Sequence, residues 1–194
     1  MSLFILNGKR ILQDQCKEGV SWDDDVPETI KCRWEQWRNE IHLLQQVKIP
    51  RCYKPEDFGE VKSVEFDHFS DASMDGYGQC SYIKLINDQG QIHCALVMAK
   101  SRVAPLKVIT IPRLELAAAV VSVKIHSVLK RQLNYQEARE IFWTDSKVVL
   151  GYIRSDAKRF KVYVANRVQQ IRDQTSPAQW KYVETDSNPA DYAS

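Results

Sequence analysis

The sequence predicts an α/β protein in which helices cover the faces of one mixed sheet, with a small helical connector ahead of it. Two observations predict this class. The hydrophobic pattern changes from helical spacing to strand-like segments after about residue 60, and the elements then follow in the order βββαβααβα. The 194 residues are 44% hydrophobic and 10% aromatic, which is enough for a packed core. We expect residues 1–55 to form the connector and residues 60–194 the sheet domain.

The connector is expected to contain one amphipathic helix, at residues 27–46. Apolar side chains recur there every three or four residues. They are Ile30, Trp34, Trp37, Ile41 and Leu44. The acidic run at residues 23–25 precedes the segment, where negative charge suits a helix N-terminus. Residues 49–60 contain two prolines and a glycine, which interrupt both kinds of periodicity, so we expect the boundary there.

Three strand-like segments follow, at residues 64–70, 79–86 and 91–99. The first mixes β-branched and aromatic residues and runs into Asp71. The other two flank residues 87–90, a turn in which Gly90 is available for positive φ. The three segments are therefore expected to form an antiparallel meander.

A long helix is expected from residue 110 or 111 to about residue 133. Pro112 suits its first turn, where a missing N–H has no intrahelical acceptor, and the alanine run at residues 117–119 suits close packing on a sheet. The remaining elements are a strand at 141–144, a helix at 146–153 capped by Ser146, a helix at 160–174, a strand at 179–183 and a closing helix from about residue 188.

Charge and cysteine content narrow the classes of function. The net charge is +2 on 27 basic and 25 acidic residues, so any nucleic-acid-binding surface must be local. None of the five cysteines forms a C-x-x-C pair or has zinc-finger spacing, which favours a reduced, intracellular setting. No stretch approaches the ~20 apolar residues of a membrane span, so we expect no membrane partner.

Four acidic residues occupy matching positions at the ends of predicted elements. Asp71 and Asp145 each close an apolar strand, whereas Glu115 and Asp191 lie in the first turns of helices. If the two strands are neighbours, the carboxylates meet at one sheet edge and repel each other unless cations neutralise them. Hard oxygen ligands favour Mg²⁺ or Mn²⁺, and two such ions form a phosphodiester hydrolysis site. Each acid taken singly is more often a structural cap, so the prediction depends on all four.

Basic and polar side chains accompany these acids. Candidates for contacts with nucleic-acid phosphates and sugars are Ser73, Lys100, Arg102, Arg113, Ser146, Asn166 and Arg167. Further basic residues are Lys107, Lys158, Arg159, Lys161 and Arg172. A solvated surface explains any single basic residue equally well, and serine and asparagine are also typical caps and turn formers. The four histidines are scattered along the sequence, and we expect them to be structural.

Several short strings point to one family. FSDAS at residues 69–73, followed by Gly76-Tyr77-Gly78, resembles the first strand and turn of retroelement ribonuclease H domains. More specific are KSRVAPLK at residues 100–107 and TIPRLEL at residues 110–116. With WTDS at 143–146, VANRV at 164–168 and NPAD at 188–191, the chain resembles the BEL/Pao group of LTR retrotransposons along nearly its whole length. Families built on this segment have been labelled Pao retrotransposon peptidase.

This resemblance implies a ribonuclease H-like fold that hydrolyses the RNA strand of RNA–DNA hybrids. It also implies a pol polyprotein with reverse transcriptase and integrase portions, in the cytoplasm or in virus-like particles. Carried over by position, Asp71, Glu115, Asp145 and Asp191 are the catalytic acids and hold two Mg²⁺ or Mn²⁺ ions. Two features depart from the family pattern. Residues 180–185 lack the histidine of many ribonucleases H, and the chain ends three residues after Asp191, so we expect a truncated closing helix and a weakly held Asp191.

Two other functions stay open at this stage. An aspartic peptidase needs Asp-Thr/Ser-Gly turns, whereas this chain has DAS at 71–73, DSK at 145–147 and DSN at 186–188, so the peptidase is disfavoured. A catalytically inactive remnant or connector that binds nucleic acid or packs on a polymerase is the stronger alternative. Metal-dependent cleavage of a hybrid would distinguish it from a ribonuclease H.

Overall fold

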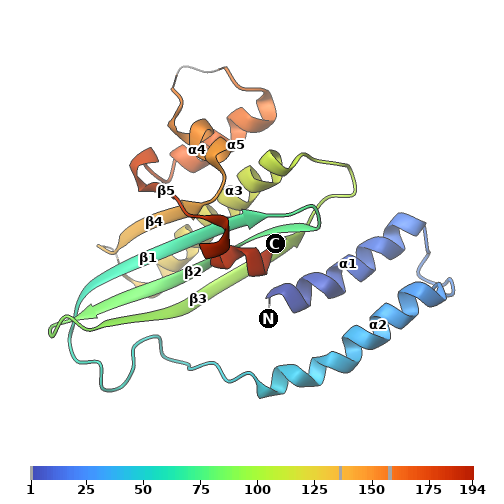
Figure 1. The fold of residues 1–194 in the computed structure, drawn as a ribbon, viewed down its shortest axis with the longest axis horizontal. Coiled ribbons are helices and arrows are strands. Elements are labelled where there is room, and N and C mark those ends of the chain that lie inside the picture. The colour runs from blue at the N-terminus through green and yellow to red at the C-terminus, as the bar shows by residue number, and fades with distance from the viewer. Residues whose placement is uncertain (1, 136, 157–158) are drawn as a thin grey trace.

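The computed structural model of the chain describes residues 2–135, 137–156 and 159–194. Its centre is a five-stranded sheet in the order β3-β2-β1-β4-β5 (Figure 1). The strands are β1 (Val61–Ala72), β2 (Gly76–Asn87), β3 (Ile92–Val103), β4 (Arg139–Thr144) and β5 (Trp180–Tyr182). β1, β2 and β3 pair antiparallel, whereas β4 runs parallel to β1 and β5 runs parallel to β4. The predicted mixed sheet is confirmed, and from β1 to β5 the strands and α-helices follow one another along the chain as predicted.

The antiparallel meander contains the predicted turn. The side-chain oxygen of Asn87 accepts the backbone N–H groups of Gln89 at 3.0 Å and Gln91 at 2.8 Å, and Gly90 adopts a φ of 78°. Each of the three strands spans 12 residues and is longer than its predicted segment. The difference arises because cross-strand pairing continues past the apolar stretch that sequence periodicity detects.

Helix α3 (Ile111–Leu133) covers one face of the sheet and lies behind it in Figure 1. Its bounds agree with the prediction. Leu116, Ala118 and Ala119 are completely buried, as expected where small side chains bring a helix close to a sheet. Helices α4 (Lys147–Arg154) and α5 (Val162–Arg172) complete the larger hydrophobic cluster, which surrounds the stacked rings of Phe142 and Trp180.

The last element is a 3₁₀ helix, η4 (Pro189–Ala193), in place of the predicted closing α-helix. It lies on the sheet face opposite α3, in front of β1 and β2 in Figure 1. Asn188 caps it, because its side-chain oxygen accepts the N–H of Ala190 at 3.2 Å. Five residues are too few for a stable α-helix, and the tighter 3₁₀ form is usual at this length. Between α5 and η4 lie two shorter 3₁₀ helices, η2 (Pro177–Gln179) and η3 (Thr185–Ser187).

The connector contains two helices rather than the one predicted. The expected helix is α2 (Glu28–Glu40), which tightens into the 3₁₀ helix η1 (Ile41–Gln46). Beside it lies α1 (Ser2–Glu18), which was not predicted (Figure 1). Trp37 joins them, since its indole N–H donates to the carbonyl of Phe4 at 2.8 Å and the two rings stack at 5.2 Å. The pattern of α1 was missed because its apolar residues are consecutive at 3–6 instead of forming a regular stripe.

Residues 47–60 form no helix or strand, as the proline-rich boundary segment predicted. The division into a connector and a sheet domain stays a prediction, because α1 also packs on β3 and the two parts share this contact. Among the described residues, no helix is both long enough and apolar enough to cross a bilayer.

Gly8 permits the close contact between α1 and α2, and this can be tested. A Cβ at Gly8 would lie 2.7 Å from Cζ2 of Trp37, whereas a Cβ at Gly151 in α4 would meet nothing within 4 Å. We predict that Gly8→Ala lowers the free energy of unfolding by up to about 2 kcal/mol, because overpacking exceeds the gain in helix propensity. The control Gly151→Ala should raise it by about 0.5–1 kcal/mol. Urea denaturation measures both, and equal stabilisation would contradict the packing of α1 on α2.

Candidate active site

The parallel pairing of β1 with β4 brings two of the predicted acids together. Ser70 of β1 is the register partner of Thr144 of β4, so Asp71 and Asp145 are the next residues at the same edge of the sheet. Neighbouring strands lie about 4.8 Å apart, and the two carboxylates therefore emerge beside each other. Asp71 is 9% exposed, which places one of these charges largely out of water.

Ser146 holds Glu115 at this edge. Its hydroxyl caps α4 by accepting the N–H of Val149 at 3.2 Å, and the same hydroxyl donates to Glu115 Oε2 at 2.6 Å. Glu115 lies near the start of α3, so this bond ties the beginning of α3 to the turn that follows β4. The predicted cap at Ser146 is confirmed, and the cap also orients a candidate metal ligand.

Helix η4 carries the fourth acid, Asp191, across β1 and β2. The amide of Asn188 donates to the carbonyl of Ser70 at 3.2 Å, and Ser194 donates to Asp71 Oδ2 at 2.5 Å. These bonds anchor both ends of η4 at the edge that contains Asp71. The backbone therefore holds Asp191 near the other acids through contacts with the sheet, which sequence periodicity did not reveal.

Gly78 of β2 makes room for η4. It is the register partner of Asp71, and a Cβ at this position would overlap the carbonyl oxygen of Ala193. The same carbonyl accepts the hydroxyl of Ser101 of β3 at 2.7 Å. Only glycine allows the end of η4 to lie this close to the sheet.

The four carboxylates interact electrostatically. Burial raises the pKa of Asp71, and the nearby charges of Asp145 and Asp191 raise it further. Burial also raises the pKa of Glu115, with Asp145 and Asp71 adding to the shift. The four sequence-predicted acids are therefore near enough to interact, and the nearby charges oppose the ionisation of Asp71 and Glu115.

The chemistry of this set fits hard divalent cations. All the donors are carboxylate oxygens, and Oδ1 of Asp145 is buried with no hydrogen-bond partner among the described residues. No three of the four offer ligand atoms within 4.8 Å of one another. Instead they interact in overlapping pairs, Asp71 with Asp145 and Asp191, and Glu115 with Asp145 and Asp71. Metal binding at this edge stays a prediction, which the carboxylate chemistry of the set supports.

Three of the predicted nucleic-acid-binding residues meet in a groove of about 270 Å³ between α3, α5 and the ends of β2 and β3. They are Arg102, Asn166 and Arg167. Lys124 of α3 also lines the groove and was missed by the sequence analysis. Lys124 lies seven residues, or two helical turns, after Ala117, which also lines the groove. This spacing puts the two residues on the same face of α3 and is the sequence signal that could have indicated Lys124. The groove thus combines three cationic side chains with two amides, those of Asn166 and Gln170.

Arg113 and Arg167 lie on the same tyrosine. The guanidinium carbon of Arg167 is 3.4 Å from the centre of the Tyr163 ring and that of Arg113 is 5.2 Å away, both within cation–π range. The hydroxyl of Tyr163 donates to the carbonyl of Arg113 at 3.3 Å. These contacts link α5 to the start of α3, two residues before Glu115.

Ser73, Lys100 and Ser146, which were also predicted to contact nucleic acid, do not line the groove. Ser73 accepts the N–H groups of Asp75 and Gly76 in the turn after β1, and Lys100 is exposed on β3. The proton of the Ser146 hydroxyl is engaged by Glu115. Their roles toward nucleic acid stay predictions, and Lys158 lies outside the described residues.

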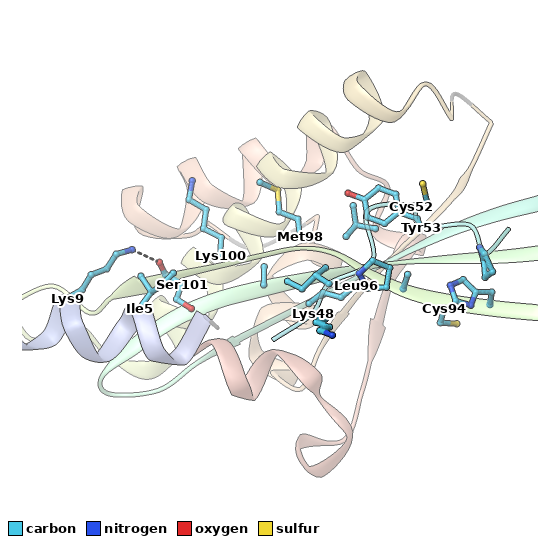
Figure 2. Close-up of a pocket in the computed structure, with 17 residues that line it drawn as sticks. Ile5, Lys9, Lys48, Cys52, Tyr53, Cys94, Leu96, Met98, Lys100 and Ser101 are labelled. Atoms are coloured by element: carbon cyan, nitrogen blue, oxygen red, sulfur yellow. Dashed lines mark hydrogen bonds between the residues drawn. The ribbon is translucent and has the colours of Figure 1, made fainter. Parts of the chain in front are cut away.

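An apolar cavity of about 780 Å³ lies elsewhere, between α1, residues 48–55 and β3 (Figure 2). Ile49, Leu96 and Met98 line it, and at one end Lys9 donates to the carbonyl of Ser101 at 3.4 Å. None of the four acids lines it. The cavity therefore belongs to the contact between connector and sheet and not to the candidate active site.

Comparison with protein families identifies the chain. A family model described as the Pao retrotransposon-like RNaseH-like domain matches residues 1–146. The chain belongs to this family. The match contains Asp71, Glu115 and Asp145 as well as α1 and α2, whereas Asp191 lies beyond it.

Solved ribonuclease H structures are similar to this Pao-family chain at low identity. RNase H1 from the halophilic archaeon Halobacterium salinarum NRC-1 is 11% identical, with a TM-score of 0.42 over 66% of this chain and 91% of that chain. LC11-RNase H1 in complex with an RNA/DNA hybrid is 9% identical, with a TM-score of 0.43 over 66% and 91%. The foamy viral protease-reverse transcriptase in complex with dsDNA is 13% identical, with a TM-score of 0.36 over 92% of this chain and 35% of that chain. The comparison with curated proteins found no match.

The raised pKa values of Asp71 and Glu115 make stability depend on pH. Between the ordinary pKa and the raised one, the folded chain binds more protons than the unfolded chain, so stability falls as the pH rises through that window. We predict that Asp145→Asn, which removes a repelling charge, raises the melting temperature near pH 7.5 in metal-free buffer. The expected rise is about 2–4 °C, equivalent to about 1 kcal/mol.

Protons stabilise the folded chain at lower pH, whereas Mg²⁺ should stabilise it more at higher pH. Because it competes with protons for the same oxygens, it should raise the melting temperature of the native chain more near pH 7.5 than near pH 5, and raise that of Asp145→Asn much less. Asp57→Asn, at an exposed carboxyl in the irregular segment, is the matched control and should respond to Mg²⁺ as the native chain does. A lower melting temperature for Asp145→Asn without metal would contradict the proposed repulsion.

Proposed function

We propose that this chain hydrolyses the RNA strand of RNA–DNA hybrids as part of a retrotransposon pol polyprotein. The observation that supports this most is the arrangement of the four acids. Asp71, Glu115, Asp145 and Asp191 come from β1, α3, the turn after β4 and η4, and they interact at one sheet edge. Asp145 Oδ1 is buried there without a hydrogen-bond partner among the described residues. Repulsion between these carboxylates opposes folding unless cations offset it. Membership in an RNaseH-like family supports phosphodiester hydrolysis, a reaction for which two divalent cations can be used.

Two Mg²⁺ or Mn²⁺ ions held by these carboxylates would supply an activated water and stabilise the leaving 3′ oxygen. The protein contributes orientation. Ser146 fixes the Glu115 carboxylate from the α4 cap, and Ser194 bonds to Asp71 from the end of η4. Both hydroxyls donate to carboxylate oxygens and so favour the ionised forms that bind metal.

The cationic groove is the proposed contact for the hybrid. Arg102, Lys124 and Arg167 provide positive charge for backbone phosphates, and the exposed amide of Asn166 can bond to a sugar 2′-hydroxyl. Arg167 of the groove and Arg113 of α3 lie on the same Tyr163 ring, and Arg113 is two residues before Glu115, which supports a hybrid contact near the carboxylates.

The polyprotein context sets the other proposed partners. In that context the reverse transcriptase and integrase portions are the neighbours, and the setting is intracellular, in the cytoplasm or in virus-like particles. The family match over residues 1–146 includes the connector helices, which supports a connector that is part of the same unit.

Cleavage of a labelled RNA–DNA hybrid tests the proposal. We predict that the native chain requires Mg²⁺ or Mn²⁺, cuts the RNA strand and spares single-stranded RNA. Asp145→Asn should lower the rate at least about 100-fold, because metal-ion stabilisation provides several kcal/mol and each 1.36 kcal/mol is a factor of ten. Asp57→Asn should cut as the native chain does.

Binding separates a nuclease from a non-catalytic binder. Asp145→Asn should still bind the hybrid, since its groove is intact. Metal-independent cutting of equal rate by the native chain and Asp145→Asn would reveal a contaminating nuclease and contradict the proposal. Hybrid binding with no cutting by the native chain would favour the inactive binder.

The groove makes a separate prediction about salt. In the Asp145→Asn background, which keeps the substrate intact, Arg102→Gln and Lys124→Gln should each weaken hybrid binding and reduce the slope of log K against log salt by about 1. Lys62→Gln is the control, because Lys62 is exposed at the opposite end of β1 and lines no part of the groove. Unchanged slopes in the two groove variants would place the hybrid elsewhere.

A further inference from the structure

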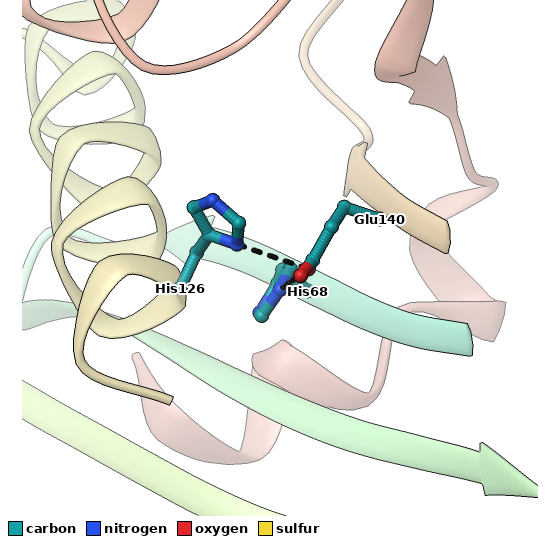
Figure 3. A group of neighbouring side chains, drawn as sticks. All are labelled: His68, His126 and Glu140. Atoms are coloured by element: carbon teal, nitrogen blue, oxygen red, sulfur yellow. Dashed lines mark hydrogen bonds and ion pairs between the residues drawn. The ribbon is translucent and has the colours of Figure 1, made fainter. Parts of the chain in front are cut away.

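A second group of metal-ligating side chains lies inside the protein, between α3 and the sheet (Figure 3). His68 comes from β1, His126 from α3 and Glu140 from β4. His68 Nε2 is 2.8 Å and His126 Nδ1 is 3.0 Å from Glu140 Oε2. The three ligand atoms all lie within 4.8 Å of one another, and the residues are 0%, 7% and 8% exposed respectively.

This group is separate from the four carboxylates. His68 and Asp71 are three residues apart on β1, so their side chains point to opposite faces of the sheet. The histidine faces α3, whereas Asp71 bonds to Ser194 on the face that carries η4. The two groups also differ in donor type, because one offers two imidazole nitrogens and the other only oxygens.

The geometry of the group is the first argument for a bound cation. Three ligand atoms from three different elements converge within 4.8 Å of one another, and none of the three residues is more than 8% exposed. A carboxylate buried this deeply is costly unless positive charge offsets it, and a cation held by the carboxylate and the two imidazoles would supply that charge.

Unsatisfied polar atoms are the second argument. His126 Nδ1 is near Glu140 but lacks hydrogen-bond geometry, and it has no other partner among the described residues. The hydroxyl of Ser122, one helical turn before His126, is also buried without a described partner. Native proteins rarely leave such atoms unpaired, and a ligand or an ordered water in this layer would satisfy them. An ion bound to Nδ1 would satisfy the imidazole directly.

The surroundings hold the ligands in place. His68 Nδ1 is 2.7 Å from the hydroxyl of Ser81, which donates to Gln79 Oε1 at 2.8 Å, so the outer ring nitrogen is fixed and Nε2 faces Glu140. Phe142 stacks on His68 at 4.8 Å and meets the edge of His126 at 5.5 Å. An apolar wall of this kind excludes water and strengthens metal binding.

We propose that His68 Nε2, His126 Nδ1 and Glu140 Oε2 bind a borderline-soft divalent cation of the Zn²⁺ class. Two imidazoles and one carboxylate are a ligand set that Zn²⁺ takes in proteins, whereas Mg²⁺ prefers oxygen donors. The ion would join β1, β4 and α3 across the core and is independent of the proposed nuclease activity. Because the ligands are buried, it would enter as the chain folds.

Metal analysis of the full 194-residue chain, refolded with Zn²⁺ and dialysed against Mg²⁺ buffer, tests this site. The native chain should retain about one equivalent of Zn²⁺, and Co²⁺ in its place should give the strong visible absorption of a tetrahedral site. His126→Gln should weaken binding by more than the about 10- to 100-fold that loss of an outer partner causes. His42→Gln, at an exposed histidine of η1, should retain the ion.

Further measurements separate this site from the carboxylates and from misfolding. Asp145→Asn should keep the Zn²⁺, and its loss in that variant would overturn the proposal. X-ray absorption of the native Zn²⁺ form should show imidazole nitrogen in the coordination shell, and it requires no variant to fold. A shell of oxygen alone, equal Zn²⁺ in His126→Gln, or no Zn²⁺ in the native chain would each overturn it.

Discussion

Repulsion between carboxylates at one edge of the sheet is the constraint on which the rest of the structure depends. The parallel register of β1 and β4 places Asp71 and Asp145 side by side, and burial prevents water from screening them. Burial, and after it these neighbouring charges, raises the pKa values of Asp71 and Glu115. A fold that keeps such a cluster loses stability without a bound cation, so the cluster is best explained by what it binds.

Several local structures serve the geometry of this edge. The Ser146 hydroxyl caps α4 and at the same time orients Glu115, so one side chain couples helix initiation to the site. Gly78 leaves room for η4, and Asn188 ties that helix to β1. None of these residues carries charge, yet each one determines how close the acids come. The acidic side chains are thus positioned by a helix cap, a glycine and a short 3₁₀ helix.

Much of this structure could be predicted from the sequence, for physical reasons. The strands and α3 have clear sequence signals, and the turn at residues 87–90 and the Ser146 cap are local signals that form as predicted. The four acids could be grouped because element ends meet at sheet edges. Helix α1 was missed because its consecutive apolar residues do not form a regular stripe, and the closing element is 3₁₀ because five residues are too few for a stable α-helix.

The internal histidine group was beyond the reach of sequence reasoning. His68, His126 and Glu140 are separated by 58 and 14 residues, and only the packing of α3 on β1 and β4 brings them together. Their separation along the chain made the histidines look unrelated. The same limit applies to the cationic groove, in which Lys124 joins Arg102 through the contact of α3 with the sheet. Such sites depend on register and packing rather than on local pattern.

Anomalous scattering from crystals of the chain grown with Mn²⁺ gives the most direct test of the carboxylate site, because it locates the ions without reference to activity. The expected result is anomalous density among Asp71, Glu115, Asp145 and Asp191, with Oδ1 of Asp145 as a ligand. The contrary result would be an ordered sheet edge with no density there, or carboxylates that point to separate surfaces.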